Sequence, residues 1–343
     1  MSKVKVLRSN LNSIFANLSA EEALLKQRIE APTLFLWRNR PTVIVGRHQN
    51  PWKECNLNSM EEADVSLARR YSGGGAVYQD LGCTTFTFLH ELHDSKSVSS
   101  IIDSNFELLA TALKNLGIPA ERKGRNDLVA DGFKISGCAF KQTTEHLIHH
   151  GTILVTTDLD HLSKYLTPSK LKLKAKGISS VAARVSKLSD FNKSVDHESV
   201  CEALSNEFKR THNASMNTET EIIDSHIQQD PVFISHHDKL RDRNWRYGST
   251  PHFEHTVETR IEGVGMFECH YEVDNGIISQ IKIFSDILVP DLVEDLERSL
   301  NGCEYEPLAL NHALTALRDS QLTDARKSIV DEFRRWILYE VSH

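Results

Sequence analysis

The stretch RRYSGGGAVYQDLG, residues 69–82, decides how this chain is interpreted. Its glycines, Gly73–Gly75, carry no Cβ, so their amides can approach a phosphate or carboxylate closely, and Arg70 adds a positive charge. The segment is not a P-loop or a dinucleotide motif, because neither G-x-x-x-x-G-K-[ST] nor G-x-G-x-x-G is present. A triple glycine alone is more often a flexible turn. The adjacent arginines favour an anion-binding site.

Two further clusters follow along the chain. The segment Gly124-Arg125-Asn126-Asp127 precedes Lys134-Ile135-Ser136-Gly137-Cys138-Ala139. Lys134 lies in a strand-like run that ends in small residues, so its ammonium group can reach a pocket, although a strand lysine usually points to solvent. His149 and His150 are adjacent in another strand-like run and must face opposite ways, so we expect one of them at most in the pocket and no joint metal chelation.

The run from His161 to Ser189 carries many lysines and no acidic residue. Its inner part, Lys176-Gly177-Ile178-Ser179-Ser180, is typical of a mobile loop. Three interpretations stay open: a solvated basic loop, closure over a nucleotide, or capture of an acidic partner. Nucleic-acid binding is disfavoured, because the net charge is −7 and few aromatic residues are interleaved with these lysines.

Hydrophobic periodicity predicts a mixture of helices and strands. Ser19 and Glu22 form a capping-box pattern, which predicts that the first helix starts there. Arg38–Pro41 separates two short apolar runs and predicts a hairpin or a tight return of the chain, and Asp274-Asn275-Gly276 predicts a hairpin. The predicted strands are 34–37, 42–45, 84–89 (with one buried face), 127–129, 133–136, 147–156, 266–273 and 277–284, and the predicted helices are 99–116, 197–210 and several within 291–340. Residues 213–250 are predicted to be polar and irregular.

The charge is unevenly distributed along the chain. Residues 250–343 contain 8 Lys and Arg against 18 Asp and Glu, whereas the preceding residues contain 32 against 29. This step predicts a domain boundary near 246–250, and the slightly basic first part suits an anionic ligand. An acidic, solvated surface remains the simpler interpretation of the C-terminal charge. We therefore predict an α+β protein with a large domain, 1–246, and a small α+β domain, 250–343.

Several classes of protein are excluded by composition. No stretch approaches the roughly 18 apolar residues of a membrane span. The six cysteines are dispersed without C-x-x-C spacing, which predicts a reducing compartment and no zinc site. The N-terminus has no apolar signal core, so we expect a cytoplasmic protein, with a mitochondrial matrix enzyme that has lost its leader as the alternative.

The clusters RRYSGGGAVYQDLG (69–82), GRNDLV (124–129), KISGCAFK (134–141) and HHGTIL (149–154), in this order, resemble the lipoate–protein ligase family. The upstream VGRHQNPWKECN (45–56) and the AKGI loop (175–178) share the resemblance, which covers about residues 1–210 and extends more weakly over the C-terminal part. It implies a large mixed sheet with flanking helices, as in biotin–protein ligases, followed by a small accessory domain.

The resemblance also implies roles for individual residues. Arg70 and Gly75–Tyr78 would contact the nucleotide and its phosphate, and Lys134 would be the catalytic residue that bridges the lipoyl carboxylate and the phosphate. The loop around Lys176 would fold over the adenylate. Cys83 departs from the pattern, because bacterial ligases commonly have Asn there. The full set of implied substrate or nucleotide contacts is Arg70, Ser72, Gly73, Gly74, Gly75, Ala76, Val77, Tyr78, Cys83, Asn126, Asp127, Gly137, Ala139, His150, Thr152 and Lys176.

The implied reaction is activation of lipoate by ATP, with Mg²⁺, to lipoyl-AMP, followed by transfer to a lysine. The implied acceptors are the lipoyl domains of 2-oxoacid dehydrogenase complexes and the glycine-cleavage H protein. We expect a monomer. The main alternative is a transfer-only lipoyltransferase that uses preformed lipoyl-AMP or a lipoylated donor protein. Octanoyl transfer and a noncatalytic sensor are further alternatives, whereas a biotin ligase is disfavoured because its Arg-Gly-rich loop is missing.

Overall fold

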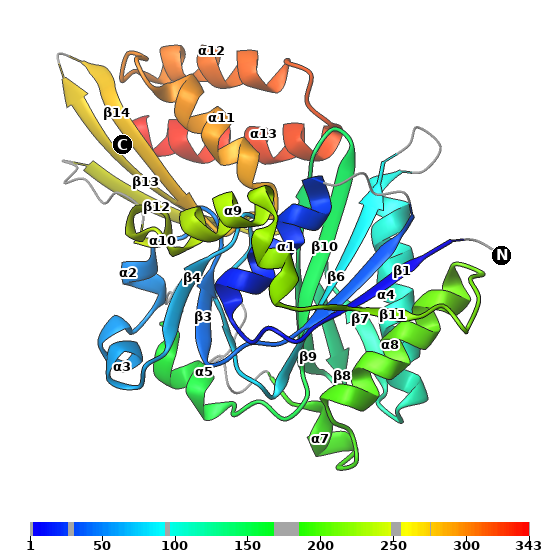
Figure 1. The fold of residues 1–343 in the computed structure, drawn as a ribbon. Helices are drawn as coiled ribbons and strands as arrows, with labels where there is room; N and C mark the ends of the chain where they lie inside the picture. The colour runs from blue at the N-terminus through cyan, green and yellow to red at the C-terminus, as the bar shows by residue number, and fades with distance from the viewer. Residues whose placement is uncertain are drawn as a thin grey trace.

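The computed structural model describes residues 3–26, 31–92, 97–167, 185–247, 255–274 and 276–342 (Figure 1). None of the helices in these ranges is long and apolar enough to cross a membrane. In chain order the elements are β1 (Lys5–Ser9), α1 (Ile14–Lys26), β2 (Thr33–Trp37), β3 (Thr42–Val45), α2 (Pro51–Glu54), α3 (Leu57–Glu62), β4 (Ser66–Arg69), β5 (Val77–Gln79), β6 (Cys83–Glu91), α4 (Val98–Asn115), β7 (Ala120–Lys123), β8 (Asp127–Ala130), β9 (Phe133–Gln142), β10 (His146–Leu154), α5 (Asp160–Tyr165), α7 (Leu188–Phe191), α8 (His197–Thr211), β11 (Thr220–Ile223), the 3₁₀ helix η2 (Ser225–Gln229), α9 (Pro231–Arg241), α10 (Arg243–Tyr247), β12 (His255–Ile261), β13 (Gly265–Asp274), β14 (Ile277–Ser285), α11 (Pro290–Leu300), α12 (Pro307–Arg318) and α13 (Asp324–Ser342).

A mixed eight-stranded sheet organises the first part of the chain. Its order is β11-β1-β2-β6-β10-β9-β8-β7. β11, β1 and β2 run parallel to their neighbours in that group, and all the later pairs are antiparallel. The fold class predicted from the sequence is confirmed.

Helices α4 and α8 cover one face of this sheet, side by side at the right of Figure 1. Phe106 and Leu109 of α4, and Phe208 of α8, belong to the same buried cluster as the side chains from that face. The Ser97 side chain caps α4 by accepting from Ser100 N, and Gly117, with φ +78°, follows its end. Both helices were predicted within two residues. β6, however, is buried on both faces, whereas its alternation had predicted one.

The opposite face is covered by α1, α9 and a three-stranded sheet of order β4-β3-β5. Two predictions fail here. α1 begins at Ile14, and Ser19 lies inside it with its hydroxyl donating to Phe15 O, 2.6 Å away, so Ser19 is not a cap. β2 and β3 do not form a hairpin, because β2 joins the large sheet while β3 pairs with β4 and β5. A short apolar run does not show which sheet will bury it.

The stretch 213–250, predicted to be irregular, contains β11, η2, α9 and α10 among its described residues. Asp230 caps α9 and Pro231 starts it, which are ordinary start signals. α10 is held against β4, because Arg69 Nε donates to Trp245 O at 2.8 Å and Trp245 Nε1 donates to Arg69 O at 2.9 Å. Tertiary contacts therefore order a segment whose composition is polar.

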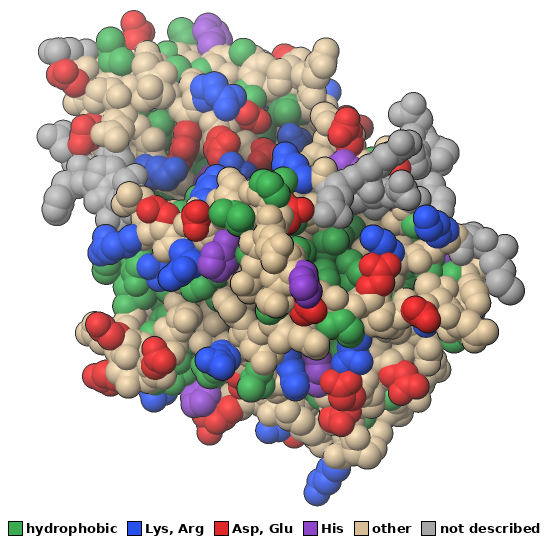
Figure 2. All heavy atoms as spheres, in the orientation of Figure 1, with side chains coloured by type: hydrophobic (Ala, Val, Ile, Leu, Met, Phe, Trp, Pro, Cys, Tyr) green, Lys and Arg blue, Asp and Glu red, His purple; other side chains and the backbone are tan. Residues whose placement is uncertain are grey.

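The C-terminal part consists of the β12-β13-β14 sheet and helices α11, α12 and α13, at the top of Figure 1. β13 and β14 are antiparallel, as predicted, and Gly276 has φ +79°. Ser285 N donates to His48 O at 2.9 Å, and Arg47 forms ion pairs with Asp291 and Glu294 of α11. Acidic and basic side chains lie together along this junction in Figure 2. Part of the acidic C-terminal surface thus contacts the basic first part directly.

Candidate active site

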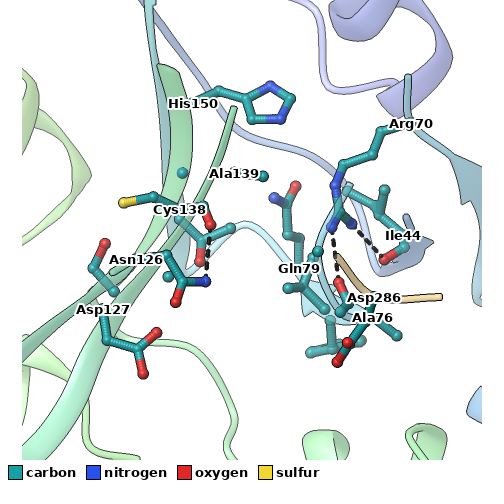
Figure 3. A pocket seen from close by; sticks show the side chains of 18 of the residues that line it. Ile44, Arg70, Ala76, Gln79, Asn126, Asp127, Cys138, Ala139, His150 and Asp286 are labelled. Carbon is teal, nitrogen blue, oxygen red and sulfur yellow. Dashed lines mark hydrogen bonds between the residues drawn. The ribbon is translucent and has the colours of Figure 1, made fainter. Parts of the chain in front are cut away.

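A cavity of about 280 Å³ lies where the large sheet, the small sheet and the C-terminal part meet. One end is apolar and is lined by Leu18, Trp37 and Ile44, which share a buried cluster. The C-terminal part contributes lining residues that the sequence did not suggest, including Arg260 and Asp286. Figure 3 shows how the labelled side chains converge on this space from both sides.

Strand register builds the floor of the cavity. Thr85 of β6 pairs with Thr152 of β10, which pairs with Gly137 of β9, which in turn pairs with Asp127 of β8. Residues directly opposite one another share a face of the sheet, so this row turns toward the cavity together. His150 lies two residues before Thr152 on the same face. His149 points the other way, as predicted, and its ring packs among aromatic residues.

Lys134 reaches the cavity from β9. Its Nζ lies 2.6 Å from Asp127 Oδ1, and the two side chains are 24% and 19% exposed. Gly137 makes room for it, because a Cβ at that position would lie 2.8 Å from Lys134 Nζ. The pocket-facing lysine predicted from the small residues around it is therefore present. Its ion pair with Asp127 was not predicted.

Arg70 is buried and supports the glycine-rich loop from behind. Its Nη2 donates to Gly73 O at 2.6 Å and Gly75 O at 2.9 Å, and its Nε donates to Ser72 Oγ at 3.1 Å. Burial lowers the pKa of Arg70 to about 10, and the nearby Glu21 carboxylate opposes that shift. Most N–H groups of the guanidinium therefore donate hydrogen bonds that fix the shape of the loop, while its positive charge still faces the cavity.

The loop also contacts the C-terminal part. A Cβ on Gly73 would lie 2.1 Å from Ile287 O, and Gly74, at φ +89°, donates its amide to that same oxygen at 3.2 Å. The prediction that the glycine amides converge on an anion is therefore not met by Gly74 in this structure. Its amide is used by a backbone carbonyl instead.

A buried hydrogen-bonded chain links the loop to helix α1. His150 Nδ1 donates to the Glu21 carboxylate at 2.9 Å, and His150 Nε2 is hydrogen bonded to Ser72 Oγ at 2.7 Å. Thr87 Oγ1 also donates to Glu21, at 2.7 Å. Sequence reasoning missed Glu21, because a glutamate in an ordinary helix gives no sign that its partner lies on a distant strand.

Glu21 should make stability depend on acid pH. Burial by itself raises the pKa of Glu21, but attraction to His150 and hydrogen bonds from His150 and Thr87 outweigh it, so the pKa lies below 4.5. The stabilisation is therefore fully present above pH 4.5 and is lost as the pH falls through the folded-state pKa. We expect the melting-temperature difference between wild type and Glu21→Gln to be largest at neutral pH and to shrink in acid. A constant difference between pH 3 and 7 would contradict this assignment.

Most of the residues predicted for the site lie together around the cavity. Those that line it are Arg70, Gly74, Gly75, Ala76, Val77, Tyr78, Asn126, Asp127, Lys134, Gly137, Ala139, His150 and Thr152. Ser72 and Gly73 lie just behind it. Cys83 is 1% exposed at the start of β6 and is not among the lining residues, so its predicted ligand contact is not supported. Burial raises the pKa of the Cys83 thiol. Lys176 lies outside the described residues.

Comparison with known proteins identifies the family. Residues 13–209 match the lipoyl protein ligase A/B catalytic domain, and residues 250–337 match the bacterial lipoate protein ligase C-terminus. The chain belongs to the lipoate–protein ligase family. It is 38% identical to lipoate-protein ligase A of Psychrobacter cryohalolentis over 99% of both chains, and 38% identical to that of Bdellovibrio bacteriovorus over 93% of both.

Solved structures of this family share the fold. The crystal structure of P. falciparum LipL1 in complex with lipoate is 35% identical, with TM-score 0.86, and the match covers 98% of this chain and 100% of that one. A lipoate-protein ligase A bound with ATP is 27% identical, with TM-score 0.61, over 72% of this chain and 98% of that one. A bipartite ligase from Thermoplasma acidophilum, described with its E2 lipoyl domain, is 27% identical, with TM-score 0.63, over 74% and 100%.

Proposed function

We propose that this chain activates lipoate with ATP to lipoyl-AMP, releasing pyrophosphate, and then transfers the lipoyl group to a lysine of a partner protein. The observation that carries the proposal is the shape and polarity of the cavity. Its apolar end, at Leu18, Trp37 and Ile44, suits an acyl chain, and Lys134 also lines the cavity. Relatives whose names describe lipoate and ATP as bound molecules support the same substrates.

Activation is required because a carboxylate oxygen is a poor leaving group for a lysine amine to displace. In the first step a lipoate oxygen attacks the α-phosphorus of ATP, and the bond to pyrophosphate breaks. In the second step the acceptor amine attacks the acyl carbon, AMP leaves with the bonding electrons, and the amine loses a proton. Both steps build up negative charge, so preorganised cations are the main requirement, and no covalent nucleophile on the protein is needed.

Lys134 is the residue best placed to meet this requirement. Its ammonium group is already held in the cavity by Asp127, so little reorganisation accompanies ligand binding. We assign it the bridge between the lipoyl carboxylate and the α-phosphate. The buried guanidinium of Arg70 adds positive potential behind the loop. Asn126 is fixed by donating from Nδ2 to Cys138 O at 3.1 Å, and it shapes the wall beside Lys134.

Mg²⁺ is the expected companion of ATP. When bound, it would neutralise part of the phosphate charge. Mg²⁺ bound with nucleotide phosphates needs only one or two protein carboxylates. Asp127 lines the cavity and would be the carboxylate to contact the ion, sharing its charge between Mg²⁺ and Lys134.

The proposed acceptors are the lipoyl domains of 2-oxoacid dehydrogenase complexes and the glycine-cleavage H protein. The naming of a relative together with its E2 lipoyl domain supports the first. We further propose that residues 1–246 form the catalytic domain and 250–343 the accessory domain, and that the protein acts as a cytoplasmic monomer. These assignments rest on the sequence patterns and on the family matches.

Lipoate-dependent exchange of labelled pyrophosphate into ATP tests the first step. A ligase exchanges pyrophosphate, and it lipoylates an apo lipoyl domain when given lipoate and ATP. The alternative, a transfer-only lipoyltransferase, would show no exchange but would still lipoylate the domain from synthetic lipoyl-AMP. A chain that binds lipoate without either activity would refute both enzymatic assignments.

A further inference from the structure

Gln79, the last residue of β5, has a buried polar side chain that takes no part in the reaction steps described above. It is 3% exposed, and it lines the cavity. Figure 3 shows its amide group reaching into the space between the side of Arg70 and the strand that carries Ala139. The only hydrogen bond of its side chain among the described residues is the one that its Oε1 accepts from Asn39 Nδ2, at 2.6 Å.

The orientation of this amide follows from a buried chain of side chains. Asn17 Nδ2 is 2.9 Å from Leu11 O and 3.2 Å from Arg38 O, and backbone carbonyls can only accept, so this atom must be the amide nitrogen. It also lies 2.9 Å from Asn39 Oδ1, which must therefore accept. The other amide atom of Asn39 is then the donor to Gln79 Oε1.

The Gln79 amide nitrogen, Nε2, is consequently the side-chain atom that faces the cavity. No described residue accepts from Gln79 Nε2, and since the side chain is 3% exposed and lines the cavity, this N–H group opens onto the cavity, where a ligand that displaces water must offer it an acceptor. Such a group in a cavity wall indicates a ligand that accepts a hydrogen bond. The amide oxygen of Asn17, Oδ1, accepts from Ser9 Oγ at 2.6 Å, so the chain is anchored at its far end as well.

The position of Gln79 indicates which ligand atom it meets. Gln79 lies two residues after Val77 on β5, and Val77 pairs with Ile44 of the apolar end, so the amide stands at the border of that end of the cavity. An acyl chain that fills that end places its carboxyl group at this border. We infer that Gln79 is a further substrate-binding residue, whose Nε2 donates to an oxygen of the lipoate carboxyl group. This inference rests on the proposed function.

Calorimetric titration of lipoate into the full chain without nucleotide tests the inference directly. Gln79→Met removes the donor, and we expect a loss of affinity of about 10-fold to 100-fold, the range for a hydrogen bond to a charged group. Because Gln79→Met also removes the acceptor for Asn39, Gln79→Glu is the sharper variant. It keeps an oxygen for Asn39 and turns a second oxygen toward the ligand. At pH 8, where the new carboxyl group is ionised, we expect a larger loss of lipoate affinity than in Gln79→Met.

Gln49→Glu is the matched control. Gln49 is 2% exposed, its Oε1 accepts from Gly46 N at 2.9 Å, and its Nε2 has no partner among the described residues, yet it does not line the cavity. Arg69, which donates to Gln49 O at 2.7 Å, lies close enough to offset the added charge. Its lipoate affinity should stay within about 2-fold of wild type, a change that corresponds to well under one neutral hydrogen bond.

The outcomes separate this inference from the function on which it rests. A Gln79→Glu protein that unfolds at the wild-type temperature and binds lipoate as wild type does would overturn the role of Gln79. So would a loss of ATP affinity with unchanged lipoate affinity, because Nε2 would then face the nucleotide. A wild-type chain that binds no lipoate would instead overturn the proposed function itself.

Discussion

Lys134→Ala should slow lipoyl-adenylate formation by about 100-fold or more, equivalent to at least ~3 kcal/mol in the activation barrier, the scale of one preorganised electrostatic contact. The reason is that the Lys134 ammonium is held in the cavity, 2.6 Å from Asp127, before any ligand arrives. Lipoate-dependent pyrophosphate exchange measures the effect.

The same substitution should leave the fold nearly as stable. The substitution breaks the ion pair with Asp127. Because both side chains are partly exposed, the expected cost is about 1 kcal/mol or less.

Lys141→Ala is the control for this experiment. Lys141 is on the same strand, 20% exposed, with its Nζ 2.6 Å from Glu22, but it does not line the cavity. Its removal should cost more stability than that of Lys134, because the Glu22 carboxylate left behind is only 3% exposed, but the variant should keep pyrophosphate exchange. Equal activity of both variants and wild type would place the catalytic charge elsewhere.

Gly74→Val should weaken the binding of both lipoate and ATP by about 100-fold. Gly74 has φ +89°, a conformation that a β-branched residue adopts only with strain, on the order of 1–3 kcal/mol. Its new Cβ would also lie 3.0 Å from Arg70 Nη2 and 3.4 Å from Leu288 Cδ2. Since Arg70 organises the loop, displacing its guanidinium moves the neighbouring carbonyls and the wall of the cavity.

A second glycine separates strain from site geometry. Gly302 has φ +84°, and a Cβ there would meet nothing within 4 Å. Gly302→Val should therefore lower the melting temperature through backbone strain while lipoate and ATP affinities stay at the wild-type level. If Gly74→Val behaves in the same way as Gly302→Val, the glycine-rich segment is only a turn and forms no part of the binding site.

Local patterns were sufficient for much of the fold. The spacing of apolar residues in 99–116, together with the glycine that follows, predicted α4. Apolar residues at helical spacing indicate a helix with one buried face, and a glycine after them indicates where the helix ends. The strands around Gly276 were predicted in the same way. The start of α1 was missed, because the Ser19 and Glu22 pattern occurs inside a helix whose true start carries no comparable capping box.

In the candidate site, too, some residues could be predicted from local sequence patterns and others could not. Small neighbours showed that Lys134 could reach a pocket, and strand alternation showed that His149 and His150 face opposite ways, because both are local properties of the sequence. The family resemblance selected His150. Glu21 and Gln79 could not be predicted in this way. Glu21 meets His150 across 129 positions of sequence, and Gln79 meets Asn39 across 40.

The sequence by itself therefore determined the family, the α+β class, and the charged residues and glycines around the cavity. Each of these follows from residue type: the hydrophobic period indicates helices and strands, and the motifs consist of charged residues and of glycines, whose backbone is unusually free. The tertiary structure alone decided which sheet receives β3, how Arg70 is used, that the Gly74 amide meets Ile287, and which way the Gln79 amide points. Each of these depends on a hydrogen-bond partner or a packing surface from a distant segment. Since a buried polar group must find such a partner, its orientation is settled only when the segments are folded together.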